Sequence, residues 1–127
     1  MQCYFYGVTR KEKKSVQPGG VASFSIPDLG LSFRAQFDGN REECQYAGLL
    51  ALLEFVELNS NLFRNKTLEI YGDSFIVVHQ VNLKMVCTRN LEPYRNLALV
   101  YKKKISYTLN WIPPSQNRAQ PGLAIQA

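Results

Sequence analysis

The sequence predicts a mixed α/β domain in which helices pack on both faces of a five-stranded sheet. Two observations lead to this prediction. Residues 1–37 contain three strand-like segments separated by turn sequences, which is typical of an antiparallel meander. From Asn40 onward, helical and strand-like patterns alternate, and such alternation is typical of parallel strands joined by helices. The chain has 127 residues, so we expect a single domain over residues 1–127.

The first three strands are predicted from their side chains and from the turns between them. Residues 2–8 are rich in aromatic side chains, and residues 21–26 and 31–37 alternate between polar and apolar ones. The turn sequences QPGG at 17–20 and PDLG at 27–30 precede the second and third segments. Such connections join neighbouring antiparallel strands, so the three segments should pair in chain order.

A long helix is predicted for residues 40–58. Apolar side chains recur there at helical spacing, at Tyr46, Leu49, Leu50, Leu53 and Val56. Asn40 is a favourable N-cap residue, and Glu43, three residues later, completes a capping-box pattern. The helix should therefore begin directly after Asn40.

Strand-like and helical segments continue to alternate after this long helix. Residues 66–72 are predicted to form a strand, residues 91–104 a helix, and residues 105–112 the last strand. Pro113 and Pro114 should end that strand, because proline has no backbone N–H to donate to a neighbouring strand.

Residues 74–82 carry conflicting signals. Their β-branched side chains favour a strand, whereas Asp73 or Ser74 would serve as the N-cap of a helix. The residues alone leave both alternatives open. The tail after the last strand has a weak helical tendency, which Pro121 and Gly122 interrupt.

Composition and charge restrict the class of protein. No apolar run is long enough to span a membrane, and the start of the chain lacks the order of a secretory signal, so we expect a cytoplasmic protein without a membrane partner. The net charge is +5, which is compatible with a polyanionic partner. Basic runs at 10–14, 89–95 and 101–104 make nucleic-acid binding as good an interpretation as a merely solvated surface.

The cysteines and the histidine exclude several kinds of site. Cys3, Cys44 and Cys87 are widely spaced and form no CxxC pair, so we expect buried thiols rather than disulfides or a zinc site. His79 is the single histidine, which excludes mechanisms that need two. Its apolar neighbours favour a packing role.

Four segments carry recognisable motifs: YFYGV at 4–8, EECQYAGLLALLE at 42–54, LEIYGDSFIVVHQVN at 68–82 and NWIPPSQNRAQPGLA at 110–124. In this order they resemble the ribonuclease H type 1 family. The family's matching motifs are a first strand ending in D-G-A or D-G-S, a helix with A-E-Y-x-A-L, a strand–G-D-S–helix segment, and an ending W-I-P-x-x-x-N-x-x-A-D-x-L-A. The resemblance spans essentially the whole chain. It implies the ribonuclease H fold and a helix over residues 74–82.

The resemblance also implies an activity, namely hydrolysis of the RNA strand of an RNA–DNA hybrid by two divalent metal ions held by four carboxylates. Of these four positions, Asp73 keeps its acid, whereas Tyr6, Gln45 and Pro121 occupy the other three. A catalytically inactive or severely impaired domain is therefore implied. We expect no cofactor, with Mg²⁺ or Mn²⁺ needed only if activity persists, and Asp73 as a weak metal ligand at most.

Asp73 has two interpretations. Its carboxylate could hold a metal as the remnant of a catalytic site, or it could cap a helix by accepting backbone N–H bonds from Phe75 or Ile76. We favour the cap, because the other acids are absent. Asp38, in the loop before Asn40, is the main candidate for a replacement ligand.

Nucleic-acid binding is the first functional hypothesis, with an RNA–DNA hybrid or RNA as the ligand. The resemblance places the substrate near the loops after the first strand and before the first long helix. The candidate contacts are Arg10, Lys11, Lys13, Lys14, Asn40, Arg41 and Asn117.

Two alternative functions stay open. One is an active, metal-dependent ribonuclease H with a site rearranged around Asp73. The other is a structural or oligomerisation module that binds a protein partner or a second copy of itself. In that case the aromatic side chains of Tyr4, Phe5 and Tyr6 would form the packing surface.

Overall fold

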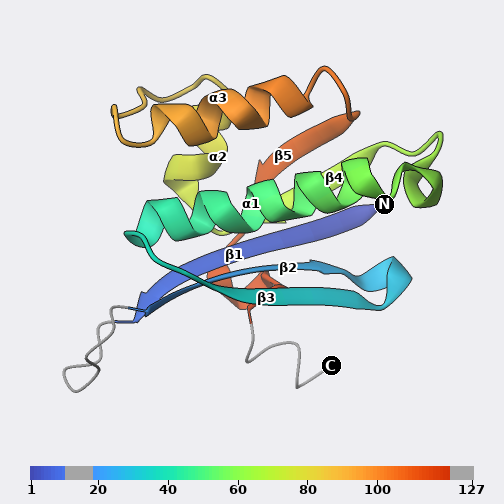
Figure 1. Ribbon diagram of the computed structural model, residues 1–127, viewed down its shortest axis with the longest axis horizontal. Coiled ribbons are helices and arrows are strands. Elements are labelled where there is room, and N and C mark those ends of the chain that lie inside the picture. Colours follow the sequence, from blue (N-terminus) through green and yellow to red (C-terminus); the bar gives the residue numbers. More distant parts are fainter. Residues whose placement is uncertain (11–18, 121–127) are drawn as a thin grey trace.

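The computed structural model describes residues 1–10 and 19–120 (Figure 1). Its strands are β1 (Gln2–Arg10), β2 (Gly19–Ile26), β3 (Leu31–Phe37), β4 (Leu68–Gly72) and β5 (Tyr107–Trp111). Its helices are α1 (Arg41–Leu58), α2 (Phe75–Val81) and α3 (Glu92–Tyr101), with the single 3-10 turns η1 (Pro27–Leu29), η2 (Ser60–Phe63) and η3 (Pro114–Gln116). The alternation predicted from the sequence is confirmed.

The five strands form one mixed sheet in the order β3-β2-β1-β4-β5. β1 pairs antiparallel with β2, and β2 pairs antiparallel with β3. β4 pairs parallel with both β1 and β5. The predicted meander and the predicted parallel strands are therefore both confirmed, and the carboxyl end of β4 lies beside the middle of β1, where Gly72 pairs with Phe5.

Helix α1 lies very close to β1, and two glycines make this approach feasible. A β-carbon at Gly7 would lie 2.3 Å from the Cys44 carbonyl carbon of α1. A β-carbon at Gly48 would lie 2.6 Å from the Tyr6 carbonyl oxygen. Because real β-carbons do not approach backbone atoms so closely, larger residues here would push the helix away from the sheet.

All three helices lie on one face of the sheet, as Figure 1 shows, and α3 packs against α1. Alternate strand residues point into the layer between sheet and helices and are buried there: Cys3, Phe5, Phe24, Ile26, Leu68, Ile70, Tyr107 and Leu109. Helix α1 contributes Leu49, Leu52 and Leu53, which are fully buried. This layer is the hydrophobic core.

The opposite face of the sheet carries no α-helix within residues 1–10 and 19–120, so the prediction of helices on both faces is not met there. Instead, the segment after β5 passes to this face, where the Ser23 hydroxyl donates a hydrogen bond to the Ala119 carbonyl oxygen over 2.8 Å. Of the tail for which a weak helical tendency was predicted, residues 114–120 contain only the 3-10 turn η3, and residues 121–127 lie outside the described part of the chain.

The conflict over residues 74–82 is resolved in favour of a helix. Ser74 is the N-cap of α2, and its hydroxyl oxygen accepts a hydrogen bond from the Val77 backbone N–H over 3.2 Å. Val77, Val78 and Val81 are buried in the core. Their burial outweighs the modest preference of β-branched residues for strands.

The predicted bounds of the last two elements need small corrections. Helix α3 ends at Tyr101 rather than at residue 104, and β5 begins at Tyr107 rather than at residue 105. Lys104 follows the helix in a turn and forms an ion pair with Glu57 of α1, with 3.3 Å between Nζ and Oε2. Within the described part of the chain, no helix is both long and apolar enough to cross a membrane.

Candidate functional site at the Asp73 edge of the sheet

The carboxyl end of β4 and the middle of β1 bring three predicted site residues together. Gly72, the last residue of β4, pairs with Phe5, so Asp73 follows directly beside Tyr6. The backbone N–H of Gln45 lies against Gly7, the residue after Tyr6. Tyr6, Gln45 and Asp73 therefore meet at the carboxyl end of β4, and we call this place the Asp73 edge.

Asp73 is partly buried, and burial raises the pKa of its carboxyl group above the ordinary value. The side-chain amide of Asn117 and the positive charge of Arg41 oppose this effect, so both lie close to the carboxylate. The carboxylate is therefore held in a mixed environment in which burial has the larger effect.

The preferred interpretation of Asp73 as a helix N-cap is wrong. Ser74 occupies the cap position of α2, and the Asp73 backbone carbonyl instead accepts a hydrogen bond from the Trp111 indole N–H over 3.2 Å. A residue one position earlier than the cap cannot reach the first free N–H groups of the helix as the cap residue does. The Asp73 carboxylate is therefore not used to cap α2.

Tyr6 presents a phenol at the position where the resemblance expects an acid. Its side chain is half-buried, and its pKa is raised by burial and by the negative charge of Asp73. A phenol with a raised pKa keeps its proton at neutral pH. Tyr6 is therefore a neutral hydrogen-bonding group, not a charged metal ligand.

Gln45 is 6% exposed, and its side-chain oxygen Oε1 has no hydrogen-bond partner within the described residues. The amide is packed inside the protein, but its oxygen is not satisfied by a hydrogen bond there. A buried acceptor without a partner costs about 1–3 kcal/mol of stability. The buried oxygen is therefore a cost to stability rather than a group on the surface of the edge.

Asn117 holds the tail against the central strand. Its amide nitrogen donates to the Phe5 carbonyl oxygen over 2.9 Å, and its amide oxygen accepts from the Ala119 backbone N–H over 3.0 Å. The side chain is fully buried. The prediction that Asn117 contacts a nucleic acid is therefore wrong, since no ligand can reach it directly.

Replacement carboxylates do not gather beside Asp73. Glu43 forms the predicted capping box with Asn40, which is confirmed by hydrogen bonds in both directions. Asp38 is exposed, and its charge, together with that of Glu43, adds to burial in raising the pKa of the Cys44 thiol at the start of α1. Within residues 1–10 and 19–120, no three His, Cys, Asp or Glu side chains are grouped as metal ligands would be.

The residues present do not fit the pair of divalent ions that the resemblance implies. The edge offers one carboxylate, a neutral phenol and a neutral amide whose oxygen is an unpaired acceptor. Two divalent ions need several carboxylates to balance their charge. Pro121, at the fourth position, lies outside the described residues.

The predicted nucleic-acid contacts are only partly placed by the structure. Arg41 is exposed in the first turn of α1, near Asp73. The Asn40 side-chain oxygen is engaged by the Glu43 backbone N–H over 2.8 Å. Arg10 ends β1, but its side chain is not described. Lys11, Lys13 and Lys14 lie outside the described residues.

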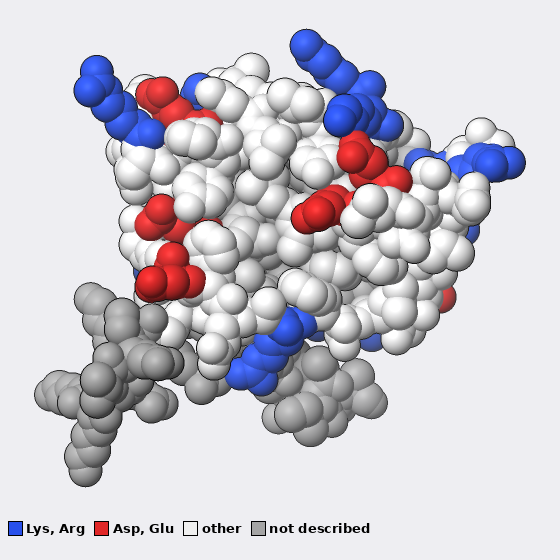
Figure 2. All heavy atoms as spheres, in the orientation of Figure 1, with Lys and Arg blue, Asp and Glu red and all other residues white. Residues whose placement is uncertain are grey.

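Charged side chains are spread over the face seen in Figure 2 rather than gathered in one basic stripe. Lysine and arginine side chains stand apart around its rim, acidic side chains lie beside several of them, and uncharged atoms cover the area between. The basic residues at the end of α3 also have partners inside the chain: Lys102 lies over the Tyr107 ring, 5.0 Å from its centroid. Net charge alone therefore does not define a binding face here.

The sequence analysis missed an exposed aromatic cluster beside the Asp73 edge. The rings of Phe75 and His79 stack with centroids 3.8 Å apart, and Trp111 lies edge-on at 6.5 Å from Phe75. The spacing of Phe75 and His79, four residues apart in a helix, was the available signal.

The aromatic side chains at the start of β1 do not form a common surface. Phe5 is only 1% exposed, so the hypothesis that it shares a packing surface with Tyr4 and Tyr6 is wrong.

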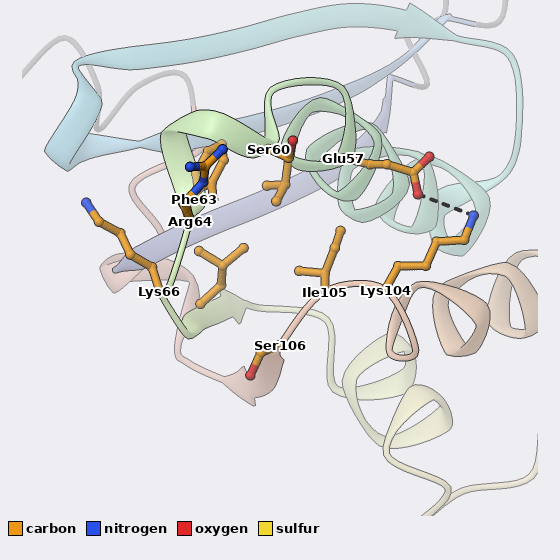
Figure 3. Close-up of a pocket in the computed structure, with 10 residues that line it drawn as sticks. Glu57, Ser60, Phe63, Arg64, Lys66, Lys104, Ile105 and Ser106 are labelled. Carbon is orange, nitrogen blue, oxygen red and sulfur yellow. Dashed lines mark ion pairs between the residues drawn. The ribbon is translucent and has the colours of Figure 1, made fainter.

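A surface pocket of about 320 Å³ lies at the other end of the sheet, where β4 begins (Figure 3). Its walls include the apolar side chains of Phe63 and Ile105, and Lys66 lies at one side of it. Because β4 runs from this pocket toward Asp73, the pocket is separated from the Asp73 edge by the length of that strand.

Comparison with solved structures shows the ribonuclease H fold. A ribonuclease H1 isolated from compost, solved in complex with an RNA/DNA hybrid, has a TM-score of 0.78 at 16% identity, covering 93% of this chain and 89% of its own. Ribonuclease H1 from the halophilic archaeon Halobacterium salinarum has a TM-score of 0.77 at 19% identity, covering 99% of this chain and 98% of its own. The N-terminal ribonuclease H domain of a Mycobacterium tuberculosis protein has a TM-score of 0.67 at 17% identity, covering 100% and 98%. No protein-family model matches the sequence.

Proposed function

We propose that this domain binds nucleic acid, an RNA–DNA hybrid or RNA, along the Asp73 edge and does not cleave it by a two-metal mechanism. The fold supports the first half of the proposal, because a ribonuclease H1 of the same fold was solved in complex with an RNA/DNA hybrid. The second half is carried by the composition of the edge, where Tyr6 and Gln45 stand in place of acids.

The side chains at the edge supply complementary groups for a ribonucleotide chain. Arg41 is the cation for a phosphate, and phosphate contacts position a nucleic acid without reading its sequence. The Tyr6 phenol, which keeps its proton, is a hydrogen-bond donor. The Asp73 carboxylate, which is only partly buried, is an acceptor for a ribose 2′-hydroxyl, the group that distinguishes RNA from DNA.

Loss of cleavage follows from charge. Two Mg²⁺ ions carry four positive charges, and one carboxylate with two neutral groups cannot balance them. Metal ligands must also be held within about 0.5 Å of the productive geometry, and exposed Asp38 is not held in that way. The edge therefore binds without hydrolysing.

Fluorescence anisotropy with labelled RNA–DNA hybrid, duplex RNA and duplex DNA at low salt tests binding. We expect the hybrid or the RNA to bind more tightly than DNA of the same length. Arg41→Ala should weaken binding roughly three- to tenfold and lower the slope of log K against log salt by about 1. Lys66→Ala is the matched control, because Lys66 is equally exposed at the other end of β4. No binding to any of the three duplexes would overturn the proposal.

A cleavage assay tests the alternative of an active enzyme with a site rearranged around Asp73. We expect no release of RNA fragments from the hybrid at high protein concentration in Mg²⁺ or Mn²⁺. Cleavage that depends on Mn²⁺ and disappears in Asp73→Asn would instead establish the rearranged site. Binding and cleavage are measured on the same hybrid, so a silent binder and an active enzyme are distinguished.

A further inference from the structure

Three aromatic rings form an exposed surface next to the Asp73 edge; we call Phe75, His79 and Trp111 the aromatic surface. Phe75 is 53% exposed and Trp111 is 44% exposed. The Phe75 and His79 rings are nearly parallel, with 24° between their planes, and Trp111 stands at 74° to Phe75. Large aromatic rings exposed together are uncommon on a monomer without a binding role.

The rings are held in place by hydrogen bonds to the backbone. The Trp111 indole N–H donates to the Asp73 carbonyl oxygen over 3.2 Å, which ties the ring to the edge. His79 Nδ1 lies 2.8 Å from the Phe75 carbonyl oxygen, so Nδ1 carries the proton and donates. Because the polar atom of the indole is used inside the protein, Trp111 presents its ring face rather than a hydrogen-bonding group. A fixed ring loses little entropy when a ligand stacks on it.

Arg41 supplies a positive charge close to the aromatic surface. Its charge acts to lower the pKa of Asp73, and the Trp111 indole is hydrogen-bonded to the Asp73 backbone, so the guanidinium and the ring lie close to the same residue. Lys84 is exposed just after α2, in a turn where its backbone N–H donates to the His79 carbonyl oxygen over 2.8 Å. On stacking platforms for single-stranded nucleic acids, cations contact phosphates and rings contact bases.

We propose that the aromatic surface binds an unpaired nucleobase of a single-stranded segment by stacking, which extends the ligand of the Asp73 edge beyond a duplex. This inference rests on the proposed nucleic-acid binding. An apolar partner would be served by the rings alone, but the positive charge of Arg41 near Asp73 adds complementarity to a polyanion. Inside a duplex the base faces are already stacked on one another, so the ligand must present a base that is free.

The experiment uses the full chain, a single-stranded RNA oligonucleotide and the same oligonucleotide with its bases removed at the central positions. Trp111 is the only tryptophan, so its fluorescence reports on this surface alone. We expect the intact oligonucleotide to quench that fluorescence and the abasic one to bind with lower affinity. Phe75→Ala should weaken binding of the intact oligonucleotide roughly five- to one-hundredfold and leave binding of the abasic one unchanged.

Two variants separate stacking from loss of structure. Phe75→Tyr keeps an aromatic ring and should retain the affinity. Phe33→Ala is the matched control, because Phe33 is also an exposed phenylalanine, 42% exposed on β3. The stacking proposal would be overturned if Phe75→Ala and Phe33→Ala weakened RNA binding equally. It would also be overturned if intact and abasic oligonucleotides bound with equal affinity. Either result would overturn it even if Arg41-dependent binding to duplexes persisted. Absence of all binding would overturn both proposals, whereas quenching by intact RNA alone supports stacking.

Discussion

The side-chain amide of Asn117 donates a hydrogen bond to the backbone carbonyl of Phe5 over 2.9 Å, although 112 residues separate them in the sequence. This bond joins the segment after the last strand to the central strand, directly beneath the Asp73 edge. Asn117 thereby supports the candidate site without being part of its surface. Its role is to fix the position of the tail against the sheet.

Replacement of Asn117 by alanine should therefore destabilise the fold by about 2–3 kcal/mol, because it leaves a buried carbonyl and a buried N–H without partners. Urea unfolding followed by circular dichroism measures this change. Asn110→Ala is the control, since the Asn110 amide is only partly buried and its hydrogen bonds are 3.3 and 3.4 Å long. A loss equal to that of the control would show that the tail is not held by Asn117.

Replacing each of the two buried glutamines, Gln45 and Gln80, by leucine should affect the free energy of unfolding differently. Gln80 is satisfied at both ends: its oxygen accepts from the Tyr46 hydroxyl over 2.8 Å, and its nitrogen donates to the Val86 carbonyl over 3.2 Å. The Gln45 oxygen has no partner in the described part of the chain. Gln80→Leu should therefore lower the free energy of unfolding by about 1–3 kcal/mol, whereas Gln45→Leu should leave it unchanged or raise it by about 1 kcal/mol.

Chemical denaturation of both variants at equal protein concentration checks this contrast, and each serves as the control of the other. Destabilisation of Gln45→Leu by as much as Gln80→Leu would mean that Gln45 has a structural partner. The pair thus tests whether the Gln45 oxygen is an unsatisfied buried acceptor beside the Asp73 edge.

The strand order was predictable from sequence because local signals and the resemblance agree. The turn PDLG at 27–30 joins two alternating strands, and Asn40 with Glu43 sets the start of α1 by a capping box that involves only neighbouring residues. Such features depend on short-range chemistry. The face on which each helix packs depends on the whole chain, and here the prediction of helices on both faces is not met by the described residues.

The site was predictable in its residue types but not in their roles. The motif around Gly72 located Asp73, yet a cap position shifts by one residue with the backbone angles, and Ser74 takes it. The exposed aromatic surface escaped because Phe75 and His79 lie in a segment whose valines already explain its apolar character. Trp111 joins them only through tertiary packing, which no local pattern reveals.

Asp73 should make stability depend on pH in a defined direction. Burial raises the pKa of its carboxyl group above the ordinary 3.8, so the folded state binds the proton more tightly than the unfolded chain does. The contribution of Asp73 to stability is therefore greatest below the ordinary pKa and declines as the pH rises toward the raised value. Relative to Asp73→Asn, which does not titrate, the native protein should lose stability between pH 3 and pH 7.

Urea unfolding at pH 3 and at pH 7 gives the free energy of unfolding of the native protein and of Asp73→Asn. Subtracting the value for Asp73→Asn from that for the native protein cancels the titration of all other groups. We expect this difference to become more negative as the pH rises. A positive change would mean that the hydrogen bond from Asn117 and the charge of Arg41 outweigh burial. In that event the carboxylate is stabilised in its charged form and the environment of the edge is more polar than its burial indicates.

Restoring acids at the edge should create the metal site that its present residues do not provide. Tyr6→Asp with Gln45→Glu would place three carboxylates together with Asp73, and the neutral groups that now stand there would be gone. We expect isothermal titration calorimetry to show Mn²⁺ binding at least about tenfold tighter in the double variant than in the native protein, since added carboxylates supply charge and hard oxygen ligands. The same double variant carrying Asp73→Asn is the control and should lose most of the gain. If the double variant remains folded and binds Mn²⁺ no better than the native chain, the geometry of the edge, rather than the missing acids, prevents metal binding.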